Sequence, residues 1–66
     1  MTFWVNGESR EMAVPATVEE LVATLGLAPK TVLVERNGLA LRRDEWREQT
    51  LAEGDRIEIV RIVAGG

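Results

Sequence analysis

Two Asn-Gly dipeptides, Asn6-Gly7 and Asn37-Gly38, constrain the fold more than any other feature of this chain. A two-residue type I′ turn requires positive φ at both central residues, and Asn followed by Gly meets that requirement at the lowest cost. Short stretches with strand character lie on both sides of each dipeptide. The sequence therefore predicts two β-hairpins, Met1–Asn6 with Ser9–Val14 and Thr31–Arg36 with Leu39–Leu41.

Alternation along these strands assigns their faces, because successive side chains of a strand point to opposite sides of the sheet. Pro15 cannot donate to a strand ladder and is expected to end the second strand. The residues predicted to face the core are Met1, Phe3, Val5, Met12, Val14, Val32 and Val34.

A single helix is predicted between the hairpins. Thr17 and Glu20 have the spacing of a capping box, with Thr17 as N-cap and Glu20 at the third helical position. Gly26 follows as the residue beyond the C-cap, so the helix should span about nine residues. Its apolar stripe has the i, i+3, i+4, i+7 spacing of one buried face: Val18, Leu21, Val22 and Leu25.

The last third of the chain completes the sheet. Arg42–Gln49 is polar apart from Trp46 and predicts a turn or a single helical turn, and Thr50–Asp55 predicts a tight loop with Leu51 tucked beneath it and positive φ at Gly54. Arg56–Val63 is the longest and most apolar strand, which favours a central place beside the first strand and parallel to it. The predicted fold is α+β: one domain over 1–63, with a mixed sheet of four or five strands gripping one helix in the β-grasp arrangement of ubiquitin-like folds.

Composition excludes most catalytic chemistry. The 66 residues include no Cys, no His and no Tyr, and Ser9 is the single serine. Cysteine nucleophiles and the commonest general base and metal ligand, His, are thus missing. Asp and Glu remain, but a core of this size leaves little room for a ligand cavity, so we expect neither an enzyme nor a bound metal or cofactor. A formal net charge of −3 argues against nucleic acid. No apolar stretch is long enough to span a membrane and no signal peptide is evident, so we expect a cytoplasmic protein.

The sequence ends in Ala64-Gly65-Gly66, directly after the last predicted strand. Two residues without Cβ give a thin, extendable backbone that can enter a narrow channel. The terminal carboxylate of Gly66 is ionised at neutral pH. We expect residues 64–66 to form a flexible tail that presents this carboxylate to another enzyme.

Several short segments together resemble the ThiS family, the small sulfur carriers of thiamin biosynthesis. The similarity covers the full length, with Ala64 replacing a glycine that many members have. The matching segments are Val5–Glu8, Ala16–Leu21, Val34–Gly38, Glu53–Val60 and Gly65-Gly66.

The resemblance implies a carrier with no catalytic residue of its own. An adenylating enzyme related to the ubiquitin E1 class would activate the Gly66 carboxylate. A persulfide, raised by a cysteine desulfurase or on the activating enzyme, would then lead to a thiocarboxylate that donates sulfur to thiazole synthase. Two alternatives stay open: a carrier for molybdopterin synthesis or tRNA thiolation, and a β-grasp interaction module whose Gly-Gly end has no chemistry.

A partner-docking surface is also predicted from strand alternation. If Ile57, Ile59 and Val63 face the helix, the opposite face of the sheet carries exposed apolar side chains, and such surface often marks an interaction site. Arg36 and Arg61 either steer an acidic partner or are solvated sheet edges, and Arg42-Arg43 predicts a solvated turn. The docking residues are Trp4, Leu33, Val60 and Ile62.

Overall fold

The computed structural model describes residues 1–13 and 15–62. Val14, Val63 and the tail residues Ala64, Gly65 and Gly66 lie outside this range, so the predictions that concern them are not addressed by the coordinates. The described chain forms five strands: β1 (Thr2–Val5), β2 (Glu8–Glu11), β3 (Val32–Arg36), β4 (Leu39–Leu41) and β5 (Arg56–Arg61). It also has one α-helix, α1 (Val18–Thr24), and two 3₁₀ turns, η1 (Pro29–Thr31) and η2 (Arg43–Glu45).

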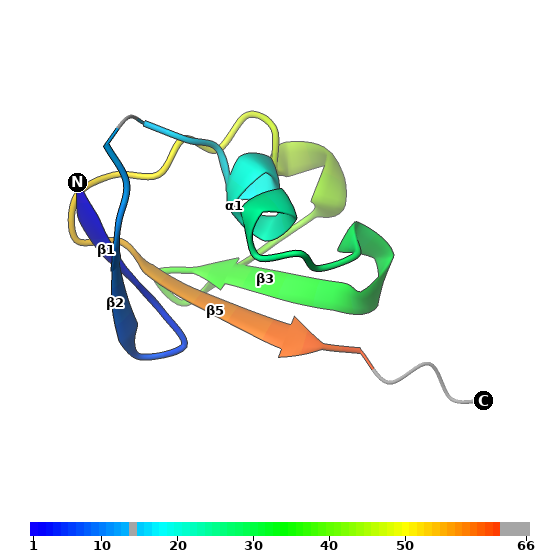
Figure 1. Cartoon of the computed structure of the whole chain (residues 1–66). Helices are drawn as coiled ribbons and strands as arrows, with labels where there is room; N and C mark the ends of the chain where they lie inside the picture. Colours follow the sequence, from blue (N-terminus) through cyan, green and yellow to red (C-terminus); the bar gives the residue numbers. More distant parts are fainter. Residues whose placement is uncertain (14, 63–66) are drawn as a thin grey trace.

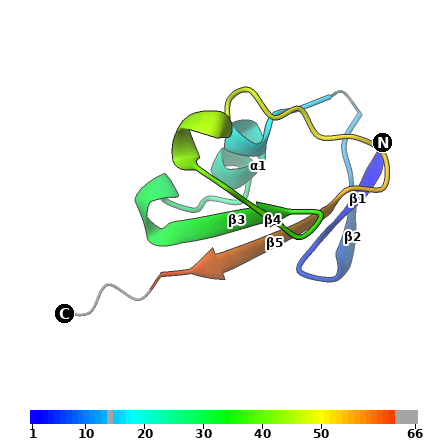
Figure 2. The same cartoon turned by 180° about the vertical axis from the view of Figure 1, so that it is seen from behind.

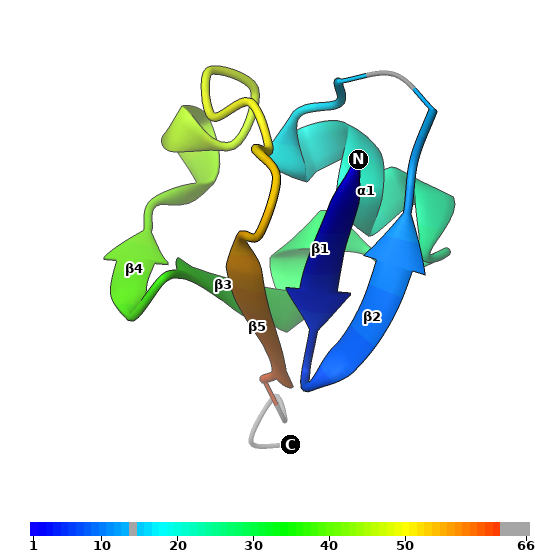
Figure 3. The same cartoon turned by 90° about the vertical axis from the view of Figure 1, so that its left-hand side faces the viewer.

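The strands form one mixed sheet in the order β2-β1-β5-β3-β4. The β1–β2 and β3–β4 pairs are antiparallel hairpins, and β5 is antiparallel to β3 but parallel to β1. The α1 helix lies across one face of the sheet, while Figure 3 looks onto the other face with α1 behind it. The predicted α+β class, the mixed sheet and the central place of the last strand beside the first are confirmed.

Both predicted hairpin turns have the expected geometry. Asn6 and Gly7 have φ of 51° and 84°, and Asn37 and Gly38 have φ of 52° and 86°. Because both central residues of each turn have positive φ, these are the turns whose twist matches the strands they join. Figure 2 shows the β3–β4 hairpin at its edge of the sheet.

Six strand ends were predicted wrongly, each by one to three residues. β1 spans Thr2–Val5 rather than Met1–Asn6, and β2 begins at Glu8 rather than Ser9. β2 ends at Glu11. The next residue, Met12, donates its N–H to Met1 O at 3.0 Å, and the sequence has no residue before Met1 with which β2 could continue to pair. β3 begins at Val32 because Thr31 belongs to η1, where its N–H and Oγ1 both donate to Ala28 O. β5 ends at Arg61, beside the first residue of β3.

The helix begins as predicted. Thr17 Oγ1 accepts from Glu20 N–H at 3.1 Å, and Glu20 Oε1 accepts from Thr17 N–H at 3.0 Å. The helix has seven residues rather than about nine, because Leu25 is its C-cap and Gly26 follows with φ of 73°. A helix this short depends on packing, and the predicted side chains Val18, Leu21 and Val22 are buried.

The core contains a residue that the sequence analysis left in a polar turn. Trp46 is 2% exposed and heads the fully buried side chains by volume. It follows η2, which confirms the predicted single helical turn, and its O accepts from Glu19 N–H of α1 at 3.2 Å. Its side chain belongs to the same core cluster as the buried residues of α1. Leu51 is buried as predicted, and Gly54 has the predicted positive φ.

β5 is a central strand of the sheet, but only one of its faces is buried. Ile57 is buried and Ile59 half-buried on the α1 side, whereas Val60 is exposed. Antiparallel neighbours allow a sheet to leave one face uncovered, and here the single helix covers only one. The opposite face, which we call the outer face, is therefore open over the described strands.

Candidate functional site

The outer face carries the predicted docking residues, but in two separate places. Leu33 on β3 lies directly opposite Val60 on β5, and they are 57% and 54% exposed. Ile62, 41% exposed, follows two residues after Val60 and so continues on the same face. These three residues form an apolar patch beside the end of β5.

Trp4 lies apart from this patch. It is 39% exposed and pairs in register with Arg56 at the start of β5. Four residues separate Arg56 from Val60, about 13 Å along a strand. The cross-strand pair Glu35 and Glu58 lies between the two places, so the outer face has two apolar areas divided by carboxylates.

A further exposed apolar residue, Leu39, does not belong to the outer face. It is 72% exposed, and its neighbour two positions on, Leu41, pairs with buried Val34. Leu39 therefore shares the register that faces α1. It provides a control position for tests of the outer face.

The two turn asparagines hold β5 in place as well as forming turns. Asn6 Oδ1 accepts from Ile59 N–H at 2.8 Å, and Asn6 Nδ2 donates to Ile59 O at 3.2 Å. At the start of the strand, Asn37 Oδ1 accepts from Arg56 N–H at 2.9 Å. Each amide side chain thus replaces a missing strand residue beside β5, a role that turn propensity alone does not predict.

Replacing Asn6 by Gly isolates this role, because Gly also adopts the positive φ of the turn. We expect Asn6→Gly to lower the free energy of unfolding by about 1–2 kcal/mol through loss of the two bonds to Ile59. Urea denaturation followed by Trp46 fluorescence measures it. Asn6→Asp keeps the Oδ1 acceptor and should lose less; an Asn6→Gly protein as stable as the original would contradict the assignment.

Asp55 joins the loop before β5 to the β3–β4 hairpin. Its carboxylate accepts from Ala52 N–H at 2.8 Å and Asn37 Nδ2 at 3.0 Å, and it pairs with Arg36 Nη2 at 2.8 Å. Burial is the largest influence on the pKa of Asp55 and raises it. The hydrogen bonds from Ala52 and Asn37 and the charge of Arg36 together lower it by more, so the pKa lies below its usual 3.8.

This network decides the role of Arg36. Its other guanidinium nitrogen, Nη1, donates to Gln49 Oε1 at 2.9 Å. Because both guanidinium nitrogens are held by residues of the fold, Arg36 has a structural role. The two interpretations drawn from the sequence, a charge that steers a partner and a solvated sheet edge, are both wrong for this residue. Arg42 does lie in a solvated turn, paired with Asp44 at 3.1 Å while both side chains stay largely exposed.

No group of three or more acidic, His or Cys side chains is arranged to hold a metal ion within residues 1–13 and 15–62. Over the same residues, no helix has the length and hydrophobicity needed to traverse a bilayer.

A mixed sheet with a parallel β1–β5 pair at its centre and one helix across one face defines a ubiquitin-like β-grasp protein. The ThiS family model matches residues 3–66. The chain is 40% identical over 50 residues to the sulfur carrier protein ThiS of Bacillus subtilis, covering 76% of each chain. It therefore belongs to the ThiS family.

Two further similarities agree with this membership. The crystal structure of a thiamine biosynthesis protein (ThiS) from Geobacter metallireducens superposes with a TM-score of 0.86 at 32% identity, covering 100% of both chains. A thiazole synthase from Magnetococcus marinus is 38% identical over 66 residues. The chain spans only 20% of the length of the thiazole synthases that it matches.

Proposed function

We propose that this chain carries sulfur as a thiocarboxylate on Gly66 and delivers it to thiazole synthase in thiamin biosynthesis. The observation that carries the proposal is the family match, which runs to residue 66 and so includes the Gly65-Gly66 end. Similarity to part of two thiazole synthases supports that enzyme as the acceptor and favours the thiamin pathway over molybdopterin synthesis or tRNA thiolation.

The chemistry needs three steps on the carboxylate. A carboxylate oxygen attacks the α-phosphorus of ATP in an E1-like adenylating enzyme, and pyrophosphate leaves. The terminal sulfur of a persulfide, supplied by a cysteine desulfurase or another donor, attacks the acyl-adenylate carbonyl and displaces AMP. A thiol then reduces the acyl disulfide and releases the thiocarboxylate.

In this scheme the carrier is not an enzyme and works in the cytoplasm. The body, residues 1–63, provides the surface that partners recognise, and Ala64, Gly65 and Gly66 form a flexible tail that enters their active sites. Figure 1 shows β5 running away from the end of the sheet where the N-terminus lies.

Incubation with ATP, a sulfur donor and the cognate adenylating enzyme tests the proposal. A carrier gains the mass difference between one sulfur and one oxygen, measured by intact mass spectrometry. An interaction module keeps its mass. Transfer of labelled sulfur to thiazole synthase, but not to molybdopterin synthase, separates the pathways.

The docking role of the outer face is tested by Val60→Glu. Placing a charge opposite Leu33 should weaken binding to the adenylating enzyme and to thiazole synthase at least about tenfold, the effect of losing one well-packed apolar contact. Isothermal titration calorimetry with each partner measures it. Leu39→Glu, an equal change on an exposed leucine outside the outer face, is the control; unchanged affinities of Val60→Glu for both partners would contradict docking here.

A further inference from the structure

β5 has a neighbour along its whole length on one side only. Its register with β3 runs from Arg36↔Ile57 to Val32↔Arg61. Its register with β1 covers just Trp4↔Arg56 and Val5↔Ile57. On the β1 side, the sheet therefore stops well before the end of β5.

The unpaired edge falls at Arg61. Bonded and non-bonded pairs alternate along an antiparallel ladder, and Ile62 N–H donates to Thr31 O at 2.7 Å. Ile57, Ile59 and Arg61 therefore direct their backbone groups away from β3. Ile57 O accepts from Asn6 N–H and Ile59 is bonded by the Asn6 side chain, but no strand of the described chain lies beside Arg61 on that side.

A groove opens next to this edge, on the α1 side of the sheet. It has a volume of about 330 Å³, at the lower end of the range of ligand pockets. Besides its charged residues and Asn6, the groove is lined by five apolar residues: Val5, Leu25, Leu27, Val32 and Ile59.

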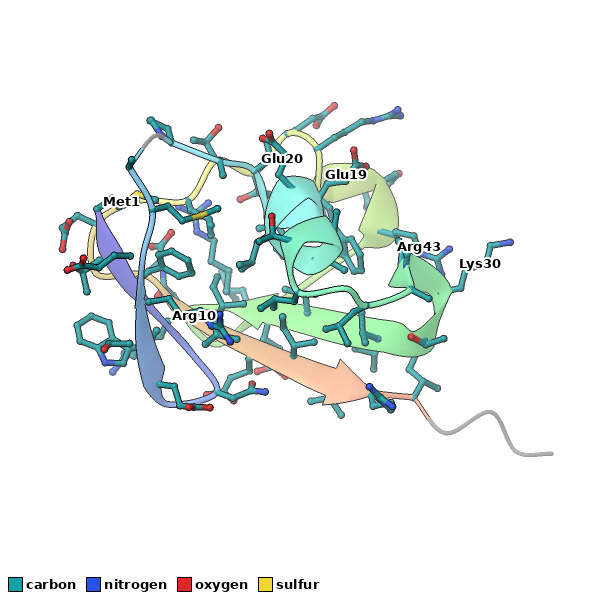
Figure 4. The ribbon with its side chains drawn as sticks, in the orientation of Figure 1. Met1, Arg10, Glu19, Glu20, Lys30 and Arg43 are labelled. Atoms are coloured by element: carbon teal, nitrogen blue, oxygen red, sulfur yellow. The ribbon has the colours of Figure 1, made fainter. Side chains whose placement is uncertain are left out.

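The rim of the groove is basic in a chain whose net charge is −3. Arg10 and Arg61 both line it, against one carboxylate, Glu8. Figure 4 shows Arg10 extending from β2 on the side of the sheet that carries α1. Neither arginine is in an ion pair within the described part of the chain, so both guanidinium groups are free to pair with an acidic partner.

An open strand edge, a groove beside it that is partly lined by apolar side chains, and a basic rim together fit one kind of occupant. Extended peptides add to free strand edges through backbone hydrogen bonds, and pockets for alternate side chains select their sequence. We propose that the adenylating enzyme adds an extended segment to β5 at Arg61. The segment places an apolar side chain in the groove and an acidic side chain against Arg10.

This inference rests on the proposed function and adds a mechanism to it. Five residues separate Arg61 from Gly66, about 16 Å of extended chain. A strand added at Arg61 would fix the direction in which that length leaves the body. The carbonyl carbon of Gly66 would then arrive in line with ATP at lower entropic cost.

Hydrogen exchange of the Arg61 amide tests the added strand directly. In the free carrier this amide should exchange rapidly, and in the complex with the adenylating enzyme it should slow at least about 100-fold, as bonded amides do. The Ile59 amide, already bonded by Asn6, serves as the internal control. An Arg61 amide that exchanges equally fast in both states overturns the proposal, and so does slowing that occurs with thiazole synthase alone.

Two variants at Arg61 distinguish the contribution of its backbone N–H to binding from that of its side chain. Arg61→Ala removes the guanidinium and keeps the N–H, whereas Arg61→Pro removes both; the lost N–H points away from β3, so the fold tolerates the proline as an edge residue. We expect Arg61→Pro to bind the adenylating enzyme about tenfold more weakly than Arg61→Ala, the worth of one well-made hydrogen bond. Equal affinities of the two variants overturn the proposal.

Charge reversal tests the basic rim. Arg10→Glu should weaken binding about tenfold, and Arg43→Glu, the same reversal on η2 outside the groove, should change it less than about twofold. Equal losses of affinity in the two variants would show that the effect comes from net charge, and would contradict binding of the partner at the groove. These measurements need no turnover, so a wild-type carrier that never gains sulfur refutes the proposed function, whereas a loaded carrier with unaffected variants refutes only this inference.

Discussion

Removing Gly66 is expected to reduce thiocarboxylate formation at least about 100-fold. The shortened chain still ends in a glycine carboxylate, but its reacting carbon lies about 3.3 Å short of its position in the adenylating site. Misplacement by as little as 1 Å can cost about 100-fold in rate, because in-line attack depends on geometry. Intact mass over a time course with ATP and a sulfur donor measures the loss.

The matched control keeps the length and removes the charge. C-terminal amidation of Gly66 leaves every residue in place but eliminates the attacking oxygen, and it should abolish loading completely. Both proteins should unfold at the same urea concentration as the wild type, because the change lies outside the described fold. A des-Gly66 protein that loads at the wild-type rate would contradict a reaction at the residue 66 carbonyl.

Replacing Asp55 by Ala is expected to have the largest effect on stability, about 3 kcal/mol. The change leaves the Arg36 guanidinium without its partner in a mostly buried position, and removing one member of a buried pair costs far more than the pair contributes. It also leaves the Ala52 N–H without its acceptor. Because small domains have only about 5–15 kcal/mol of stability in total, this loss would remove roughly a fifth to more than half of it.

Urea denaturation followed by Trp46 fluorescence measures this loss. Asp44→Ala is the matched control, since it removes a carboxylate from the exposed pair with Arg42 and should cost less than about 0.5 kcal/mol. Similar losses of unfolding free energy for the two variants would show that the hydrogen bonds and ion pair of Asp55 stabilise the fold no more than an exposed ion pair does.

The same network sets a dependence on pH. The pKa of Asp55 is lower in the folded chain than its usual 3.8, so the folded state favours the ionised form. Its stabilising contribution is complete above about pH 4 and is lost as the pH falls through the lower, folded value. The difference in unfolding free energy between wild type and Asp55→Asn should therefore be constant from neutral pH to about pH 5 and shrink below pH 4.

Local signals in the sequence predicted the elements but not all of their ends. The two Asn-Gly turns and the Thr17–Glu20 capping box were found because each depends on residues a few positions apart. The ends of β2 at Glu11 and β5 at Arg61 and the start of β3 at Val32 were missed because a strand stops where its neighbour stops, which no local pattern records. The exposure of Trp4, Leu33, Val60 and Ile62 followed from alternation, whereas the carboxylates that divide them depend on the register of β3 against β5.

Trp46 and Arg36 show the same limit in the core. A single Trp in a polar run has no periodicity, and only the tertiary fold, which joins the end of η2 to α1, assigns it to the core. Arg36 reads as a surface charge until the fold brings Asp55, 19 positions later in the sequence, to within 2.8 Å.

The sequence alone determined the order of strands and helix, the capped helix start and the two tight turns, because these are properties of neighbouring residues. It also carried the family likeness, with its Gly-Gly end. Only the tertiary structure decided which side chains form hydrogen bonds along β5, where the edge of β5 stays open and which residues line the groove beside it. The physical reason is that hydrogen-bond pairing and burial join residues distant in the chain, and their partners are chosen when the sheet closes.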